Sequence, residues 1–177
     1  MRKILVLLSA LMVSSVAMGS IVLSPGVAYK TSSVEVSGAK TESNQMLIDG
    51  RLGYVLPMGL YVGGMYSILN QGDEVDSNGG HLMGPSIGYY SMMGFYTLLT
   101  YHILGEMDTS STQTLTGGKG PQIDIGWVFP ISSFFAIGPQ MSYRSVEFDK
   151  VENSGVSTDT DYKATTIQPY LSLWFMF

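Results

Sequence analysis

Large apolar side chains occupy every second position over the last eight residues of the chain. The apolar set is Leu171, Leu173, Phe175 and Phe177. The residues of the opposite parity include Ser172 and Tyr170. A period of two predicts a β-strand with one apolar face and one polar face. An apolar face that ends on an exposed aromatic ring is unfavourable in water and favourable in lipid, so this strand is predicted to lie in a membrane.

The same alternation recurs along the chain, with connections of two kinds. The alternating segments are residues 21–31, 44–56, 59–70, 81–91, 94–106, 119–129, 133–148 and 161–177. The tight connections are residues 57–58, 92–93 and 130–132, and the long polar ones are residues 32–43, 71–80, 107–118 and 149–160. Short turns at one end and long loops at the other are typical of a transmembrane barrel. The sequence therefore predicts an all-β fold, an eight-stranded antiparallel up-and-down barrel formed by residues 20–177, with both termini at the short-turn end.

The predicted lipid-facing positions carry no charged residue, as a membrane surface requires, because an Arg or Lys at the midplane costs about 2–4 kcal/mol. Their aromatic members sort by height into two groups, which predicts a girdle at each interface, whereas strand propensity alone would scatter them. The group at the long-loop ends is Tyr29, Tyr66, Tyr101 and Tyr143. The group at the tight-turn ends is Tyr54, Tyr89, Phe95, Trp127, Phe129, Phe135 and Phe175.

The N-terminus has the pattern of a secretory signal peptide. Arg2 and Lys3 precede an apolar stretch over residues 4–16, which is short for a bilayer span, and small residues follow at 17–19. Cleavage is predicted between Gly19 and Ser20, so residues 1–19 are expected to be removed. The alternative is a retained membrane anchor.

Charge and cysteine content narrow the function classes. The formal net charge is −5, and removing the two cations of the signal peptide makes it −7. This acidity argues against nucleic acid as a partner. The chain has no cysteine and therefore no disulfide framework. No cofactor is predicted.

Five prolines lie inside predicted strands at outward positions, although a closed barrel has no free edge for a residue that lacks an N–H. They are Pro25, Pro85, Pro121, Pro139 and Pro169. Glycine precedes Pro85, Pro121 and Pro139. β-Bulges are one way to accommodate them.

With these features, the chain resembles the small eight-stranded outer-membrane barrels of the OmpA/OmpX type over all of residues 20–177. The ending Tyr170-x-Ser172-x-x-Phe175-x-Phe177 is similar to the signal read by the barrel-assembly machinery, with Ser172 where glycine is usual. The resemblance implies an outer-membrane location with extracellular loops and periplasmic termini. It also implies outer-membrane lipid, lipopolysaccharide, the assembly machinery and periplasmic chaperones as partners. The family includes adhesins, structural anchors, small pores and lipid-modifying enzymes, so it implies no single activity.

The inward positions carry a polar set and an aromatic set. The polar set is Lys30, Asp49, Arg51, Gln122, Asp124, Gln140, Arg144 and Gln168. Strands two and six lie opposite each other in an eight-stranded barrel, so Asp49 and Arg51 are expected to reach Asp124 across the lumen. Buried charges must pair or be hydrated, which predicts a polar plug, with an ion-selective constriction as the alternative. Four inward aromatic residues are predicted to seal the tight-turn end: Tyr61, Tyr90, Tyr96 and Trp174.

Seven inward glycines leave two possibilities for the interior: they make room for the tyrosine rings, or they leave a water-filled cavity. They are Gly26, Gly53, Gly63, Gly84, Gly88, Gly126 and Gly138.

Catalytic and metal chemistry find little support in the sequence. A hydrolase needs a nucleophile, a base and an orienting group, and neither His81 nor His102 lies at a recognisable spacing from a serine. The acidic stretch 73–78 lacks the full spacing of a calcium loop. The predicted function is therefore a non-enzymatic, structural or surface-interaction barrel that acts through four loops, and the alternatives are a narrow pore and, third, a lipid-A-modifying enzyme.

Overall fold

The computed structural model describes residues 19–36, 39–72, 77–110, 112–153 and 155–177. The predicted signal peptide, apart from Gly19, lies outside these residues, as do most of the acidic stretch 73–78 and the side chains of residues 30–45. No helix in the described part of the chain is long and apolar enough to cross a membrane.

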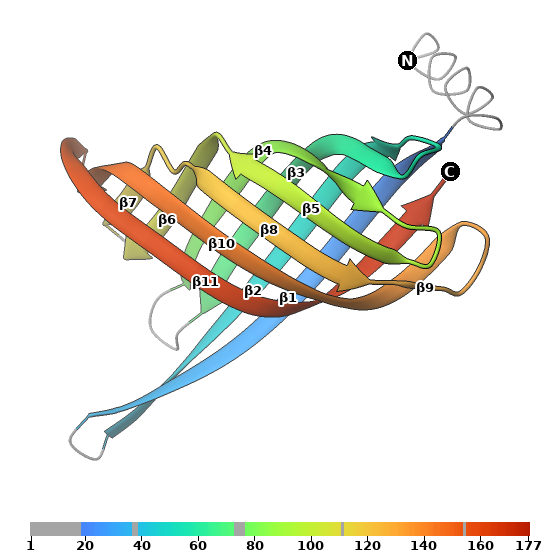
Figure 1. Ribbon diagram of the computed structural model, residues 1–177. Helices are drawn as coiled ribbons and strands as arrows, with labels where there is room; N and C mark the ends of the chain where they lie inside the picture. The colour runs from blue at the N-terminus through green and yellow to red at the C-terminus, as the bar shows by residue number, and fades with distance from the viewer. Residues whose placement is uncertain (1–18, 37–38, 73–76, 111, 154) are drawn as a thin grey trace, which may run out of the picture.

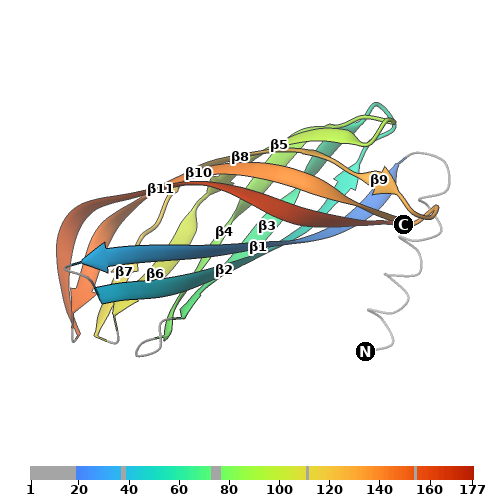
Figure 2. The same cartoon turned by 90° about the horizontal axis from the view of Figure 1, so that it is seen from below.

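Eleven strand segments form one antiparallel sheet that closes on itself, because the last strand pairs with the first (Figures 1 and 2). They are β1 (Ser20–Val36), β2 (Ala39–Val55), β3 (Leu60–Gly72), β4 (Ser77–Tyr90), β5 (Phe95–His102), β6 (Leu104–Ser110), β7 (Gln113–Thr116), β8 (Gly120–Trp127), β9 (Phe129–Pro130), β10 (Phe135–Asn153) and β11 (Val156–Met176). β6 continues the line of β5, and β7, β8 and β9 follow one another along a single line, so the wall has eight strands. The predicted eight-stranded antiparallel barrel is confirmed.

The prediction of four long loops is wrong. β1 and β2 pair as far as Val36 and Ala39, and β10 and β11 pair as far as Asn153 and Val156. The other two hairpins also extend through most of their predicted loops. Most residues of these segments are polar, so the segments lack the regular alternation that marks a half-buried strand, but cross-strand backbone hydrogen bonds do not require an apolar face.

The turns at the opposite end are tight, as predicted. The Gly59 N–H donates to the Leu56 carbonyl (2.8 Å) and the Leu56 N–H donates to the Leu60 carbonyl (2.8 Å), with φ of +86° at Gly59. This pattern is a short hairpin turn closed by a residue in the left-handed region, where glycine is unstrained. Gly94, with φ of +85°, closes the next tight turn in the same way.

The outer surface of the barrel is apolar. Every predicted lipid-facing residue whose side chain the structure describes is exposed or half-buried, and none is buried. Leu52 and Ile125, for example, expose about half or more of their surface at mid-wall. An apolar belt of this kind is stable only against lipid tails.

Each Gly-Pro step faces a carbonyl oxygen that lacks its usual donor. By the register of the adjacent pairs, Pro139 lies opposite Trp127, and any other residue at 139 would donate its N–H to that carbonyl. Proline cannot donate, and the Trp127 oxygen lies so close to Gly138 that a Cβ there would collide with it. Gly84 faces the Tyr101 carbonyl, and Gly120 faces the Ser145 carbonyl, in the same manner.

Bulges do not explain most of these prolines. The register changes only opposite Pro85, where Ser86 pairs with Thr100 but Met83 pairs with Leu104. It is constant across the other four prolines, so the bulge prediction is wrong for them. A glycine before the proline, which lets the strands approach, is the physical solution at Pro121 and Pro139.

Inward glycines at the tight-turn end lie under aromatic rings. Tyr61 covers Gly53 and Gly63, and Tyr96 covers Gly126 so closely that a Cβ at 126 would overlap its ring. Tyr61 and Tyr96 are fully buried. These glycines therefore make room for tyrosines rather than for water.

Replacing Gly126 with valine is expected to destabilise the barrel by about 1–3 kcal/mol, because the Tyr96 ring must move. Urea unfolding from lipid vesicles, followed by tryptophan fluorescence, measures this change. Gly64→Ala is the matched control: its Cβ would meet no atom closer than 3.7 Å, so the free energy of unfolding should stay the same or rise. Equal losses in both variants would contradict this packing.

Candidate functional site

Four charged side chains meet in the middle of the barrel. Asp49 and Arg51 come from β2, Asp124 from β8 and Arg144 from β10, and the period of two turns all four inward. Both carboxylates are completely buried, and the arginines expose 1% and 5% of their surface. Two acids and two bases balance in formal charge, which is the condition for burying them together.

Each arginine forms its shortest ion pair with a different carboxylate. Arg51 Nη2 donates to Asp124 Oδ2 at 2.7 Å, and Arg144 Nη2 donates to both oxygens of Asp49 at 3.0 and 3.2 Å. Arg51 also lies 3.7 Å from Asp49 Oδ2, so the two pairs are linked. These contacts join strands on opposite sides of the lumen.

Two glutamines extend the ion pairs, and Gln122 connects them to each other. Gln122 Nε2 donates to Asp124 Oδ1 (2.9 Å), and its Oε1 accepts from Arg144 Nε (2.6 Å). Gln140 Nε2 donates to the same Asp124 oxygen (3.0 Å). Asp49, Arg51, Gln122, Asp124, Gln140 and Arg144 thus form one continuous hydrogen-bonded group, called here the polar network.

Sequence reasoning missed three members that complete this group. Ser67 accepts from Arg144 Nη2 (3.2 Å), Tyr96 donates to Gln140 Oε1 (2.8 Å), and His102 Nε2 lies 3.0 Å from Gln122 Oε1. All three are buried. The alternation in the sequence places all three side chains on the inward face. Their level along the barrel axis depends on strand register, which the alternation alone does not give.

Two predicted members do not join the polar network. Gln168 is buried, and its Nε2 has no hydrogen-bond partner among the described residues. The side chain of Lys30 lies outside the described residues.

The predicted aromatic seal lies between the polar network and the tight turns. Trp174 packs against Tyr96, Tyr90 and Tyr61, with ring centroids 4.7, 5.0 and 6.3 Å apart. Three of the four rings are fully buried, and Tyr90 is half-buried. Apolar residues such as Val22, Val128 and Ala136 fill the remaining space around them.

The inward residues of the predicted assembly signal are part of this packing. Ser172 Oγ accepts the indole N–H of Trp174 (3.1 Å) and lies 3.4 Å from Ser24 Oγ, which explains a hydroxyl where the family pattern has glycine. Tyr170 packs in the lumen against Ala28 and Leu47. Phe175 packs on Phe135 on the outer side, with centroids 5.0 Å apart.

The predicted girdle residues all point outward, and His81 joins the upper group. Its ring stacks on Tyr66 with centroids 6.0 Å apart. At the lower end, Phe95 packs edge-on against Trp127. Amphipathic rings at these heights are suited to the two membrane interfaces.

The buried histidine belongs to the polar network. The hydrogen-bond partner of His102 Nε2 is the side-chain oxygen of Gln122. Within the described residues, no group of three or more histidine, cysteine or acidic side chains is placed to hold a metal ion.

Comparison with known proteins identifies the fold. No protein-family model matches the chain, and no curated protein matches it. The crystal structure of Neisserial surface protein A (NspA) superposes with a TM-score of 0.53 at 14% identity, over 89% of this chain and 97% of that one. This chain has the fold of the small eight-stranded outer-membrane β-barrels of the OmpA/OmpX type. The solid-state NMR structure of outer membrane protein AlkL in DMPC bilayers superposes with a TM-score of 0.47 at 10% identity, over 89% and 90% of the two chains.

Replacing Arg144 with methionine is expected to lower the free energy of unfolding by about 3–5 kcal/mol, because Asp49 would keep its buried charge and lose its closest partner. Lys163→Met is the control. Its ion pair with Glu147 is also short, at 2.7 Å, but more than half of each side chain is exposed, so removing it should change the free energy of unfolding far less. Similar losses in the two variants would show that burial of the Arg144 pair has no special weight.

Proposed function

We propose that this protein is a non-conducting, non-enzymatic barrel of the outer membrane that anchors four β-hairpins at the cell surface. The observation that supports the proposal is that buried side chains meet across the lumen at two levels, in the polar network and in the aromatic seal below it. Eight strands leave an interior that side chains just fill, and here large side chains occupy it. The apolar belt supports residence in a membrane.

The hairpins are the part of the molecule offered to other molecules. They lie at the end of the barrel opposite the tight turns and the C-terminus (Figure 1). Paired strands hold a polar surface in a defined shape more rigidly than free loops of the same composition would. We infer that these hairpins face the extracellular side and that the tight turns and both termini face the periplasm.

The proposal extends to the partners that such a barrel needs. Outer-membrane lipid and lipopolysaccharide surround the belt, and the assembly machinery with periplasmic chaperones inserts the chain by reading Tyr170, Ser172, Phe175 and Phe177. The extracellular partner is not specified by the chemistry of the hairpins.

Refolded residues 20–177 are expected to give no steady conductance in a planar bilayer, because buried side chains of the polar network and the aromatic seal occupy the lumen. A heat-dependent shift in gel mobility first establishes that the barrel has folded. Reproducible single-channel steps from folded protein, altered in size by Asp124→Asn, would contradict the proposal and establish a pore instead.

An epitope tag inserted after Gly155, in the turn between β10 and β11, is expected to be labelled by antibody on intact cells. A Cβ at Gly155 would have no atom within 4 Å, so an insertion there disturbs no packing. The matched insertion after Met58, in a tight turn, should be labelled only after the outer membrane is permeabilised. The reverse pattern would mean that the proposed orientation is wrong.

A further inference from the structure

The wall of the barrel is open along one seam at its hairpin end. The pairing of β1 with β11 ends at Val27 and Leu171, although β1 continues to Val36 beside β2 and β11 extends back to Val156 beside β10. Figure 1 shows the β1–β2 hairpin and the β10–β11 hairpin leaving the barrel in different directions. Each hairpin therefore has an unpaired edge that faces the other.

A proline on each side removes a hydrogen bond from this seam. Ile21 and Phe177 exchange both backbone bonds, so every second residue from there has its N–H directed across the seam. In that register Pro25 lies opposite Leu173, and Pro169 lies opposite Tyr29. Proline has no N–H to donate, so both positions lose a bond that would hold β1 to β11.

The opening begins within the lipid-facing belt. Tyr29 on β1 and Ile167 on β11 lie beyond the last paired residues, and they expose 64% and 68% of their surface on the outer face. Ile167 pairs with Tyr143 of the upper aromatic girdle. Lipid chains at this height therefore reach the unpaired edges.

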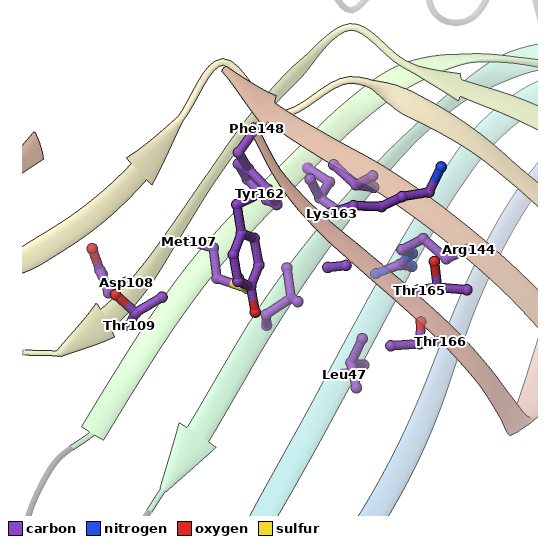
Figure 3. A pocket seen from close by; sticks show the side chains of 14 residues that line it. Leu47, Met107, Asp108, Thr109, Arg144, Phe148, Tyr162, Lys163, Thr165 and Thr166 are labelled. Atoms are coloured by element: carbon purple, nitrogen blue, oxygen red, sulfur yellow. The ribbon is translucent and has the colours of Figure 1, made fainter. Parts of the chain in front are cut away.

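Behind the seam lies a cavity of about 490 Å³ inside the hairpin end of the barrel, called here the cup (Figure 3). Side chains from six strands line it, and they are apolar on one part of the wall, as at Leu47, Leu82 and Phe148, and polar on another, as at Asp108 and Thr166. The volume falls within the range of about 300–1,000 Å³ that is usual for small-molecule sites. A wall with both kinds of lining suits a ligand that has an apolar chain and a polar end.

The cup reaches the unpaired edge of β11 and has a polar floor. Residues 162–166 of β11 line it. Among them, Lys163 and Thr165 alternate onto the outer face of the strand, the same face as Ile167. Arg144 of the polar network also lines the cup, and its Nη1 is buried with no hydrogen-bond partner. A donor without an acceptor at the base of this cavity suits a ligand with an oxygen atom at one end.

We propose that the cup binds one single-chain amphiphile, an alkyl chain with an oxygen-bearing head group, and that this ligand enters from the membrane through the β1–β11 seam. The chain occupies the apolar part of the wall, and the head group accepts a hydrogen bond from Arg144. This binding is independent of the proposed surface role, and it does not require a path through the polar network.

Photolabelling tests the site. The folded barrel in lipid vesicles is loaded with a long-chain fatty acid that carries a diazirine, irradiated, and mapped by mass spectrometry. Labelling is expected on cup residues such as Leu82 and Met107 and should saturate, because the unlabelled acid competes for it. Labelling confined to belt residues such as Ile125, or labelling that never saturates, would overturn the proposal.

Two variants separate the site from its route of access. Ala164→Phe places a ring in the cup and should lower cup labelling about tenfold, equivalent to about 1.4 kcal/mol of binding free energy, while belt labelling and folding are unchanged. Pro169→Ala returns a donor to the seam and should slow cup labelling from the membrane, whereas Pro139→Ala, which faces β8, should not. Equal rates in both proline variants would overturn access through the seam.

Discussion

The rest of the structure depends on one constraint: charges placed inside an eight-stranded barrel must neutralise one another. The interior is too narrow to hydrate four ionised groups separately, and transferring an unpaired charge out of water is strongly unfavourable. Asp49, Arg51, Asp124 and Arg144 meet this constraint by forming two ion pairs within 3.0 Å, which Gln122 bridges. Because the partners lie on β2, β8 and β10, the same contacts fix opposite walls of the barrel in register. The aromatic seal below and the cup above are separated by this layer.

The sequence predicts the architecture well because alternate residues of a membrane barrel face two different environments, the lipid outside and the lumen inside. The lipid-facing positions of β8, for example, are Ile123, Ile125 and Trp127, and their parity alone establishes which face they occupy. Toward the hairpin tips most residues are polar and the alternation ends, which is why β1 and β2 were predicted to stop near Thr31 and Asn44, although they pair as far as Val36 and Ala39. Hydrogen bonding of the backbone in those hairpins leaves no mark on the hydrophobic pattern.

The sequence predicted most residues of the polar network and one contact across the lumen, but not the remaining hydrogen bonds. Parity places Asp49, Arg51 and Asp124 in the lumen, and the opposition of their strands brings them together. The stagger of the strands decides finer matters: it brings Arg144 down to Asp49 and adds Ser67 and His102 to the group. In the same way, Pro25 and Pro169 differ from the other prolines inside predicted strands only in having no glycine before them, and nothing in the sequence shows that these two face each other's strand across the β1–β11 seam. The register of the closed sheet decides which prolines weaken the β1–β11 seam. It also decides which ones lie beside a close-packed glycine.

The central claim is that the buried ion pairs act as a linked unit that holds the barrel closed. A double-mutant cycle on Arg51 and Asp124, using Arg51→Met and Asp124→Leu in lipid vesicles, measures it most directly. Each single variant leaves one buried charge without its nearest partner, whereas the double variant leaves only the balanced Arg144 and Asp49 pair. The account predicts a coupling energy of about 2–3 kcal/mol, with the double variant more stable than the sum of the single losses implies. Additive losses, with coupling below about 0.5 kcal/mol, would contradict it.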